Sequence, residues 1–152
     1  GDWSSDVCSS DLPLELVMIK DNFTLAVVLF VSYWNDSVPE VGIYLDGKQL
    51  AVERLSKNQE IVKFEYPIEL DYGDHEISIK YENKNKEDIF WHDGKRLREN
   101  FVKLEKVFID FVDLGNLAKR DNKTVAFFNR DEFKIKFTSP IYYWMLHNVD
   151  KI

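Results

Sequence analysis

Apolar and polar positions alternate along most of this chain, and the pattern predicts β-strands rather than helices. Residues 23–34 are mostly β-branched, aliphatic or aromatic, which predicts one long strand that ends at the polar residues 35–37 and Pro39. No stretch of a dozen residues shows apolar positions at helical spacing together with capping residues. We therefore expect an all-β protein.

The strongest local signal is the pair Asp46-Gly47, which separates two alternating segments. Apolar residues alternate with others over residues 41–45, and Leu50 and Val52 continue the pattern after the pair. Both central positions of a two-residue hairpin turn need positive φ, and Asp-Gly adopts this conformation easily. The sequence therefore predicts a β-hairpin centred on this pair.

Similar patterns predict the remaining strands. A strand over residues 61–66 is expected to stop at Pro67, and residues 70–74 are expected to form a turn. Further strands are predicted over residues 75–81, 102–112, 125–128 and 133–137, with residues 113–123 as a loop. About eight short strands with turns between them predict an antiparallel β-sandwich.

The apolar segment Ile141–Leu146 follows the break at Ser139-Pro140 and has two interpretations. In the first, which we favour, the segment is an inner strand of the sandwich. In the second, it is an exposed aromatic patch that contacts a partner subunit.

The first twelve residues have a different character from the rest. Residues 1–12 resemble the translation of a short-read sequencing adapter, which implies a non-native segment and an origin in assembled environmental DNA. Residues 13–152 are then expected to form a single β-sandwich domain, with Met18 as a candidate native start.

Excluding residues 1–12 changes the composition. They hold the only cysteine, Cys8, and three acidic residues, so the remainder carries 24 acidic against 20 basic residues, a net charge of −4. This charge argues against nucleic acid as a partner. The apolar run Leu25–Val31 is too short to span a bilayer, so no membrane partner is expected.

The residues give little support for an enzyme. No phosphate-binding glycine loop, nucleophile elbow or His-x-x-x-His pair is present. His75 follows a turn and is expected to be solvated, His147 is expected to pack against neighbouring aromatics, and His92 lies among acidic residues. Carboxylate pairs are too common here to indicate glycoside hydrolysis. We expect a non-catalytic protein.

Residues 82–100 are polar and long for a connection in a compact β-domain, which makes them the candidate site. Phe90 and Trp91 are candidates for stacking on a sugar ring, with His92 and Asp93 beside them. The alternative is a solvated loop with Trp91 covering the edge of the core. The segment also offers the oxygen ligands that calcium prefers, at Asn83, Asn85, Glu87, Asp88, Asp93, Glu99 and Asn100.

Residues 41–115 resemble calcium-dependent xylan-binding modules of the jelly-roll type. The matching motifs are Tyr44-Leu45-Asp46-Gly47, Tyr81-Glu82-Asn83 and the segment before the strand at Leu104. The resemblance implies a jelly-roll fold and a bound Ca²⁺, with Asn83 and Glu99 at matching positions. Together with the loop's own oxygen donors, the candidate metal ligands are Asn83, Glu87, Asp88, Asp93 and Glu99. The chain departs from the pattern where Lys84 replaces an aspartate, and where Asn100 and Phe101 replace an arginine and an asparagine.

A second resemblance covers nearly the whole chain. The motifs Glu82–Asp88, Ile109–Gly115 and Phe137–Leu146 are similar, in this order, to small proteins encoded by tailed phages near virion genes. That group implies accessory proteins with carbohydrate-binding folds, in the virion or outside the cell. The sequence thus predicts binding to a polysaccharide or cell-surface glycan. The alternative is a structural virion accessory protein that binds other virion proteins and no small ligand.

Overall fold

The computed structural model describes residues 20–114, 127–128 and 132–149 of the chain. Within them lie the strands and helices β1 (Lys20–Ser32), β2 (Glu40–Leu45), β3 (Lys48–Arg54), β4 (Glu60–Asp71), β5 (Gly73–Tyr81), a 3₁₀ turn (Lys86–Asp88), β6 (Ile89–His92), β7 (Lys95–Glu99), β8 (Phe101–Ile109), β9 (Val112–Asp113), β10 (Phe127–Phe128), β11 (Glu132–Ser139) and α3 (Ile141–Val149). The segment 1–12, the candidate start Met18, most of the predicted loop 113–123 and the side chain of His147 lie outside the described part.

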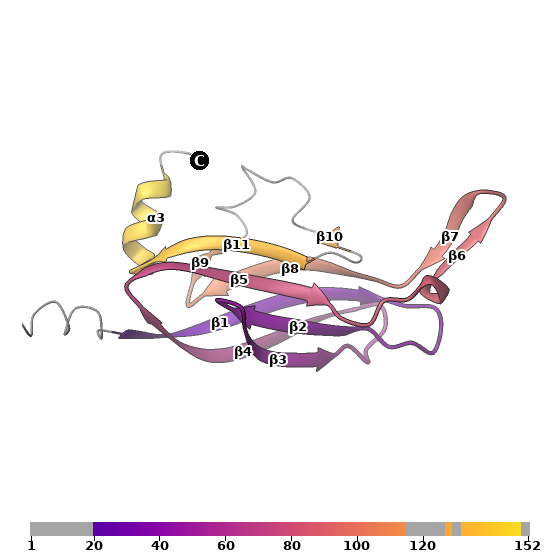
Figure 1. Cartoon of the computed structure of the whole chain (residues 1–152), viewed down its shortest axis with the longest axis horizontal. Coiled ribbons are helices and arrows are strands. Elements are labelled where there is room, and N and C mark those ends of the chain that lie inside the picture. The colour runs from indigo at the N-terminus through magenta and orange to yellow at the C-terminus, as the bar shows by residue number, and fades with distance from the viewer. Residues whose placement is uncertain (1–19, 115–126, 129–131, 150–152) are drawn as a thin grey trace, which may run out of the picture.

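Two antiparallel sheets form a sandwich, which confirms the predicted all-β antiparallel sandwich (Figure 1). One sheet has the order β10-β8-β1-β4, with β9 paired to β8, and the other has the order β11-β5-β2-β3. A third, two-stranded sheet consists of β6 and β7. The hairpin predicted at Asp46-Gly47 joins β2 to β3, with φ of 52° and 79° at the two turn residues.

The core lies between the two larger sheets, and strand alternation supplies its residues. Along β1 the inward positions are fully or almost fully buried, and they are Phe23, Leu25, Val27, Leu29 and Val31. From the opposite sheet, Ile43, Ile77, Ile79 and Ile135 pack against them. Burying this apolar surface provides most of the stabilisation of the fold.

The structure differs from the predicted elements at β4 and at α3. The strand predicted to end at Pro67 continues to Asp71, because β4 is an edge strand, where a residue without an N–H group is tolerated. The segment predicted as an inner strand, Ile141–Leu146, lies in the helix α3. Ile141 is buried and Trp144 and Met145 pack against the core, a spacing of three and four residues that suits a helix. Among the described residues, no helix has the length and apolar character needed to cross a membrane.

Candidate ligand-binding site

Within the polar segment 82–100, residues 89–99 form a hairpin rather than a loop. Strands β6 and β7 pair antiparallel, and Asp93-Gly94 forms the turn with φ of 52° and 75°. This is the same Asp-Gly signal as at Asp46-Gly47. The hairpin projects from the end of the sandwich opposite to α3 (Figure 1).

The register of the hairpin places an arginine opposite each aromatic residue. Phe90 pairs with Arg98 and Trp91 pairs with Arg96, so Leu97 is an extra residue in β7. Without this bulge, Arg96 and Arg98 would point to the same face, since side chains two residues apart in a strand share a face. Each face of the hairpin therefore carries one aromatic ring and one guanidinium group.

The aromatic rings contact the guanidinium groups but remain accessible to solvent. The Arg96 guanidinium lies 5.2 Å from the centre of the Trp91 ring, within the range of a cation–π contact. Trp91 is 54% exposed and Phe90 is 44% exposed. The alternative in which Trp91 covers the core does not apply to this arrangement. Such exposure of large rings on a projecting element is typical of binding sites.

Trp34, two residues after the end of β1, extends the face that carries Phe90. The two rings meet edge to face with 6.1 Å between their centres, and Arg98 lies 6.0 Å from the centre of the Trp34 ring. The Trp34 indole N–H donates to the carbonyl of Asp88 at 3.1 Å, which fixes the orientation of the ring. Trp34, Arg96 and Arg98 were not among the predicted site residues.

A buried polar network anchors the hairpin to the sandwich. Asn100 is completely buried, and its amide group donates to Asn35 Oδ1 and the Ser37 carbonyl while it accepts from the Trp34 backbone N–H. Asp88 is also buried, and its two carboxylate oxygens accept from Asn35 Nδ2 and the Asn85 N–H, each at 2.8 Å. Satisfied networks of this kind hold a site rigid.

A buried ion pair lies beside this network. The Lys84 ammonium group donates to Glu99 Oε1, and Arg96 Nη1 donates to Glu99 Oε2 at 2.8 Å. The Lys84 side chain is 2% exposed and that of Glu99 is 11% exposed. Lys84, which stands where the xylan-binding modules have an aspartate, therefore places a cation of the protein itself against Glu99.

The predicted metal ligands do not converge on one point. The side-chain amide of Asn83 forms hydrogen bonds with backbone groups: it accepts from the Glu40 N–H and donates to the Val38 carbonyl. Glu87 and Asp93 are exposed, and Asp93 lies in the hairpin turn, where it pairs with His92 at 3.3 Å. Among the described residues, no three side chains of His, Cys, Asp or Glu form a group able to hold a metal ion.

These contacts do not fit a calcium ion, which needs six to eight oxygen ligands. The carboxylate oxygens of Asp88 and Glu99 already accept hydrogen bonds from protein donors. The four predicted ligand-binding residues, by contrast, do lie together, because Phe90, Trp91 and His92 belong to β6 and Asp93 begins the turn.

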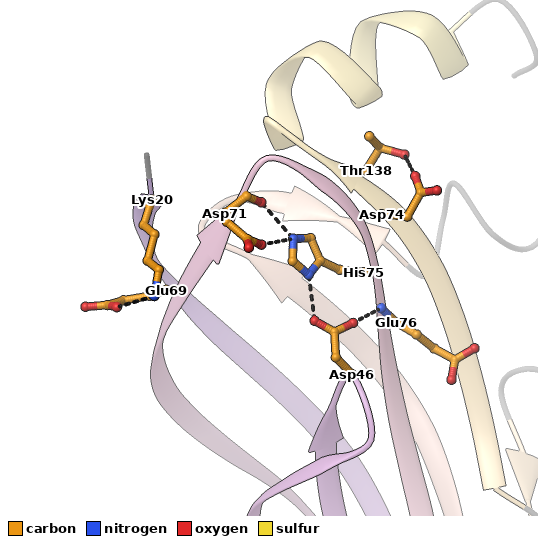
Figure 2. A network of polar contacts seen from close by, with 8 residues as sticks. All are labelled: Lys20, Asp46, Glu69, Asp71, Asp74, His75, Glu76 and Thr138. Atoms are coloured by element: carbon orange, nitrogen blue, oxygen red, sulfur yellow. Dashed lines mark hydrogen bonds and ion pairs between the residues drawn. The ribbon is translucent and has the colours of Figure 1, made fainter. Parts of the chain in front are cut away.

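A second polar cluster lies at the opposite end of the sandwich (Figure 2). His75 Nδ1 lies 2.6 Å from Asp46 Oδ2, and His75 Nε2 lies 2.7 Å from the Asp71 carbonyl oxygen. Asp46 is in the β2–β3 turn and Asp71 ends β4, so the imidazole joins the two sheets. His75 is 8% exposed, and the prediction that it is solvated was wrong.

The surroundings of His75 favour its charged form. Burial acts to lower the pKa of His75, but the hydrogen bonds to Asp46 and the Asp71 carbonyl and the two nearby carboxylates outweigh it, and the pKa is raised above 6.5. Both ring nitrogens face acceptor oxygens, and only the imidazolium ion donates from both. A hollow of about 430 Å³ lies next to this cluster, lined by Asp46, Asp74, His75, Glu76, Lys136, Phe137, Thr138 and Trp144.

No protein-family model, curated protein or solved structure matches this chain. Its function therefore has to be inferred from the arrangement of its own residues.

Proposed function

We propose that this protein is a non-catalytic carbohydrate-binding β-sandwich that holds a polysaccharide or cell-surface glycan on the β6–β7 hairpin. The observation that carries the proposal is the pairing of an exposed aromatic ring with a guanidinium group on each face of the hairpin. A sugar ring has an apolar face of C–H groups, which stacks on an aromatic ring, and a rim of hydroxyl groups, which accept hydrogen bonds from guanidinium N–H groups.

The anchoring of the hairpin supports this assignment. Trp34 forms hydrogen bonds with Asn100 and with the Asp88 carbonyl in the buried network at the base of the hairpin. The Trp34–Phe90 pair therefore keeps its geometry before any ligand binds. A rigid site loses less entropy on binding than a mobile loop. We propose that binding uses these protein groups directly and needs no calcium, because Glu99 and Asp88 are already engaged.

The decisive variant is Trp91→Ala, with Tyr72→Ala as its matched control. Tyr72 is 47% exposed and lies in the β4–β5 turn at the opposite end of the sandwich. Affinity electrophoresis through gels containing soluble xylan, β-glucan or polygalacturonate measures binding. We expect Trp91→Ala to weaken binding by about tenfold or more, as for other exposed Trp anchors, and Tyr72→Ala to leave it unchanged.

Two results would contradict this proposal. One is a wild-type protein that no polysaccharide retards. The other is a Trp91→Ala variant destabilised by several kcal/mol, since this loss is typical of a buried tryptophan.

A second candidate function, a structural accessory protein, is favoured by the surface around α3. Phe111, Tyr143 and Leu146 are exposed, and Tyr142 contacts the ring of Phe111 at 5.9 Å between centres. Sedimentation velocity at increasing concentration tests it. A strict monomer argues against self-association, and a concentration-dependent shift that Leu146→Lys abolishes supports it.

A further inference from the structure

The β6–β7 hairpin concentrates positive charge on an otherwise acidic protein. Residues 89–98 include Lys95, Arg96 and Arg98 together with His92, and their single acidic residue is Asp93. The whole chain has a formal net charge of −7. A local cluster of basic side chains on an acidic molecule indicates a site that attracts an anionic group.

Two of the three permanent cations have no acidic partner in the described part of the chain. Arg96 is held by Glu99, whereas neither Lys95 nor Arg98 forms an ion pair there. Arg98 lies over the Trp34 ring. Lys95 is the strand-register partner of His92, next to the turn at the tip of the hairpin. Their charges are therefore available to a ligand that lies along the face formed by Trp34 and Phe90.

The position of Arg98 beside the rings of this face favours a ligand that carries an anionic group on the stacked sugar. Arg98 stands directly opposite Phe90, so a sugar stacked on the Phe90 and Trp34 face has a carboxylate or sulfate group within reach of one guanidinium. Nucleic acid carries a far denser line of phosphates, which the acidic remainder of the chain repels. A neutral sugar leaves the charges of Lys95 and Arg98 unused.

We infer that the ligand of the hairpin is an acidic polysaccharide, whose carboxylate or sulfate groups pair with Arg98 and Lys95 while its rings stack on Phe90 and Trp34. This inference rests on the proposed carbohydrate-binding function and adds the chemical class of the ligand.

The test compares the same polysaccharide in an acidic and in a neutral form. Affinity electrophoresis measures binding to polygalacturonate and to its methyl-esterified, neutral form, each at low and at high NaCl; alginate serves as a second acidic probe and xylan as a second neutral one. We expect at least one acidic polysaccharide to bind about tenfold more tightly than the neutral probes, with the preference lost at high salt.

Charge variants assign the effect to the hairpin. Lys95→Gln and Arg98→Gln should each weaken binding to the acidic probe severalfold, and Arg98→Lys should retain part of it. The matched control is Lys136→Gln on β11, which removes one exposed lysine far from the hairpin. Thermal melting confirms that each variant is folded.

The outcomes separate this inference from the function on which it rests. Binding that is equal for acidic and neutral probes, or confined to neutral ones, would overturn the inference and leave carbohydrate binding intact. The absence of binding to every polysaccharide would overturn both. Tighter binding to a single-stranded oligonucleotide than to any acidic polysaccharide would also overturn the inference.

Discussion

His75 links the two sheets through a charge that depends on pH. Its pKa is raised in the folded protein, so its contribution to stability is fully present below the unfolded pKa of 6.5 and is lost as pH rises through the folded pKa. We expect the free energy of unfolding to fall between about pH 6 and pH 9 by more in the wild type than in His75→Gln. Urea unfolding at several pH values measures this difference.

The carboxylates that face His75 define the control for this prediction. Asp46 and Asp71 flank the imidazole, and Phe137 packs against it with 5.7 Å between ring centres. Asp46→Asn removes the nearer charge and should reduce the pH dependence. An identical pH dependence in the wild type and His75→Gln would show that the imidazole stays neutral.

The burial of His75 shows where residue-level prediction fails. A histidine after a turn is usually solvated, and its partner Asp46 lies 29 residues earlier in the chain. The strand predicted over residues 75–81 does form, and it places Ile77 and Ile79 in the core. The missing information was the contact between the β2–β3 turn and the β4–β5 turn, which no local pattern contains.

The buried pair Lys84–Glu99 should contribute strongly to stability. Replacing Lys84 with methionine leaves the Glu99 carboxylate nearly buried with Arg96 as its remaining cation, and breaking a buried pair costs about 3 kcal/mol or more. The control is Lys134→Met, which breaks an exposed pair with Glu132 and should cost under about 1 kcal/mol. Denaturant unfolding compares the two, and equal small losses would mean that water solvates Glu99.

At the scale of elements, turn chemistry predicted one hairpin and should have predicted another. Asp93-Gly94 carries the same signal as Asp46-Gly47, but the charged residues around it obscured the strand pattern. The bulge at Leu97 adds to this, because it interrupts the alternation along β7. The strand content of the C-terminal segment was overestimated, since its aromatic residues suit a strand by composition and a helix by spacing.

The hairpin should be removable without loss of the fold. It pairs with neither large sheet, and Ile89 and Glu99 are register partners at its base, so Asn-Gly can replace residues 90–98 as a two-residue turn. We expect the melting temperature to change by only a few degrees and glycan binding to disappear. A large drop in melting temperature would mean that the hairpin supports the core, and retained binding would place the site elsewhere.

At the scale of the whole molecule, the predicted sandwich and the predicted calcium site have different origins. The sandwich follows from alternation along each strand, and Leu25, Ile77 and Ile135 lie in the core as that alternation requires. The calcium site was predicted from the oxygen-bearing residues of segment 82–100 and from a family resemblance, and neither contains information on the contacts of those residues. Whether a carboxylate is free for a metal depends on neighbours such as Lys84 and Asn35, which approach from distant segments.

Thermal melting in calcium and in chelator tests the whole molecule for a resident metal. A calcium ion bound to Glu99 would have to displace the Lys84 ammonium group, which would stay close to the ion. Two cations close together in a buried position repel each other, and this costs Coulomb energy. We therefore expect superimposed melting curves, with magnesium as the control for general salt effects. A ligand at about 100 times its Kd stabilises the folded state by roughly 2.7 kcal/mol, which is several degrees for a domain of this size. A shift of that size in calcium alone would mean that the segment 82–100 rearranges around the ion, and the contacts of Lys84 and Asp88 would then describe the metal-free state.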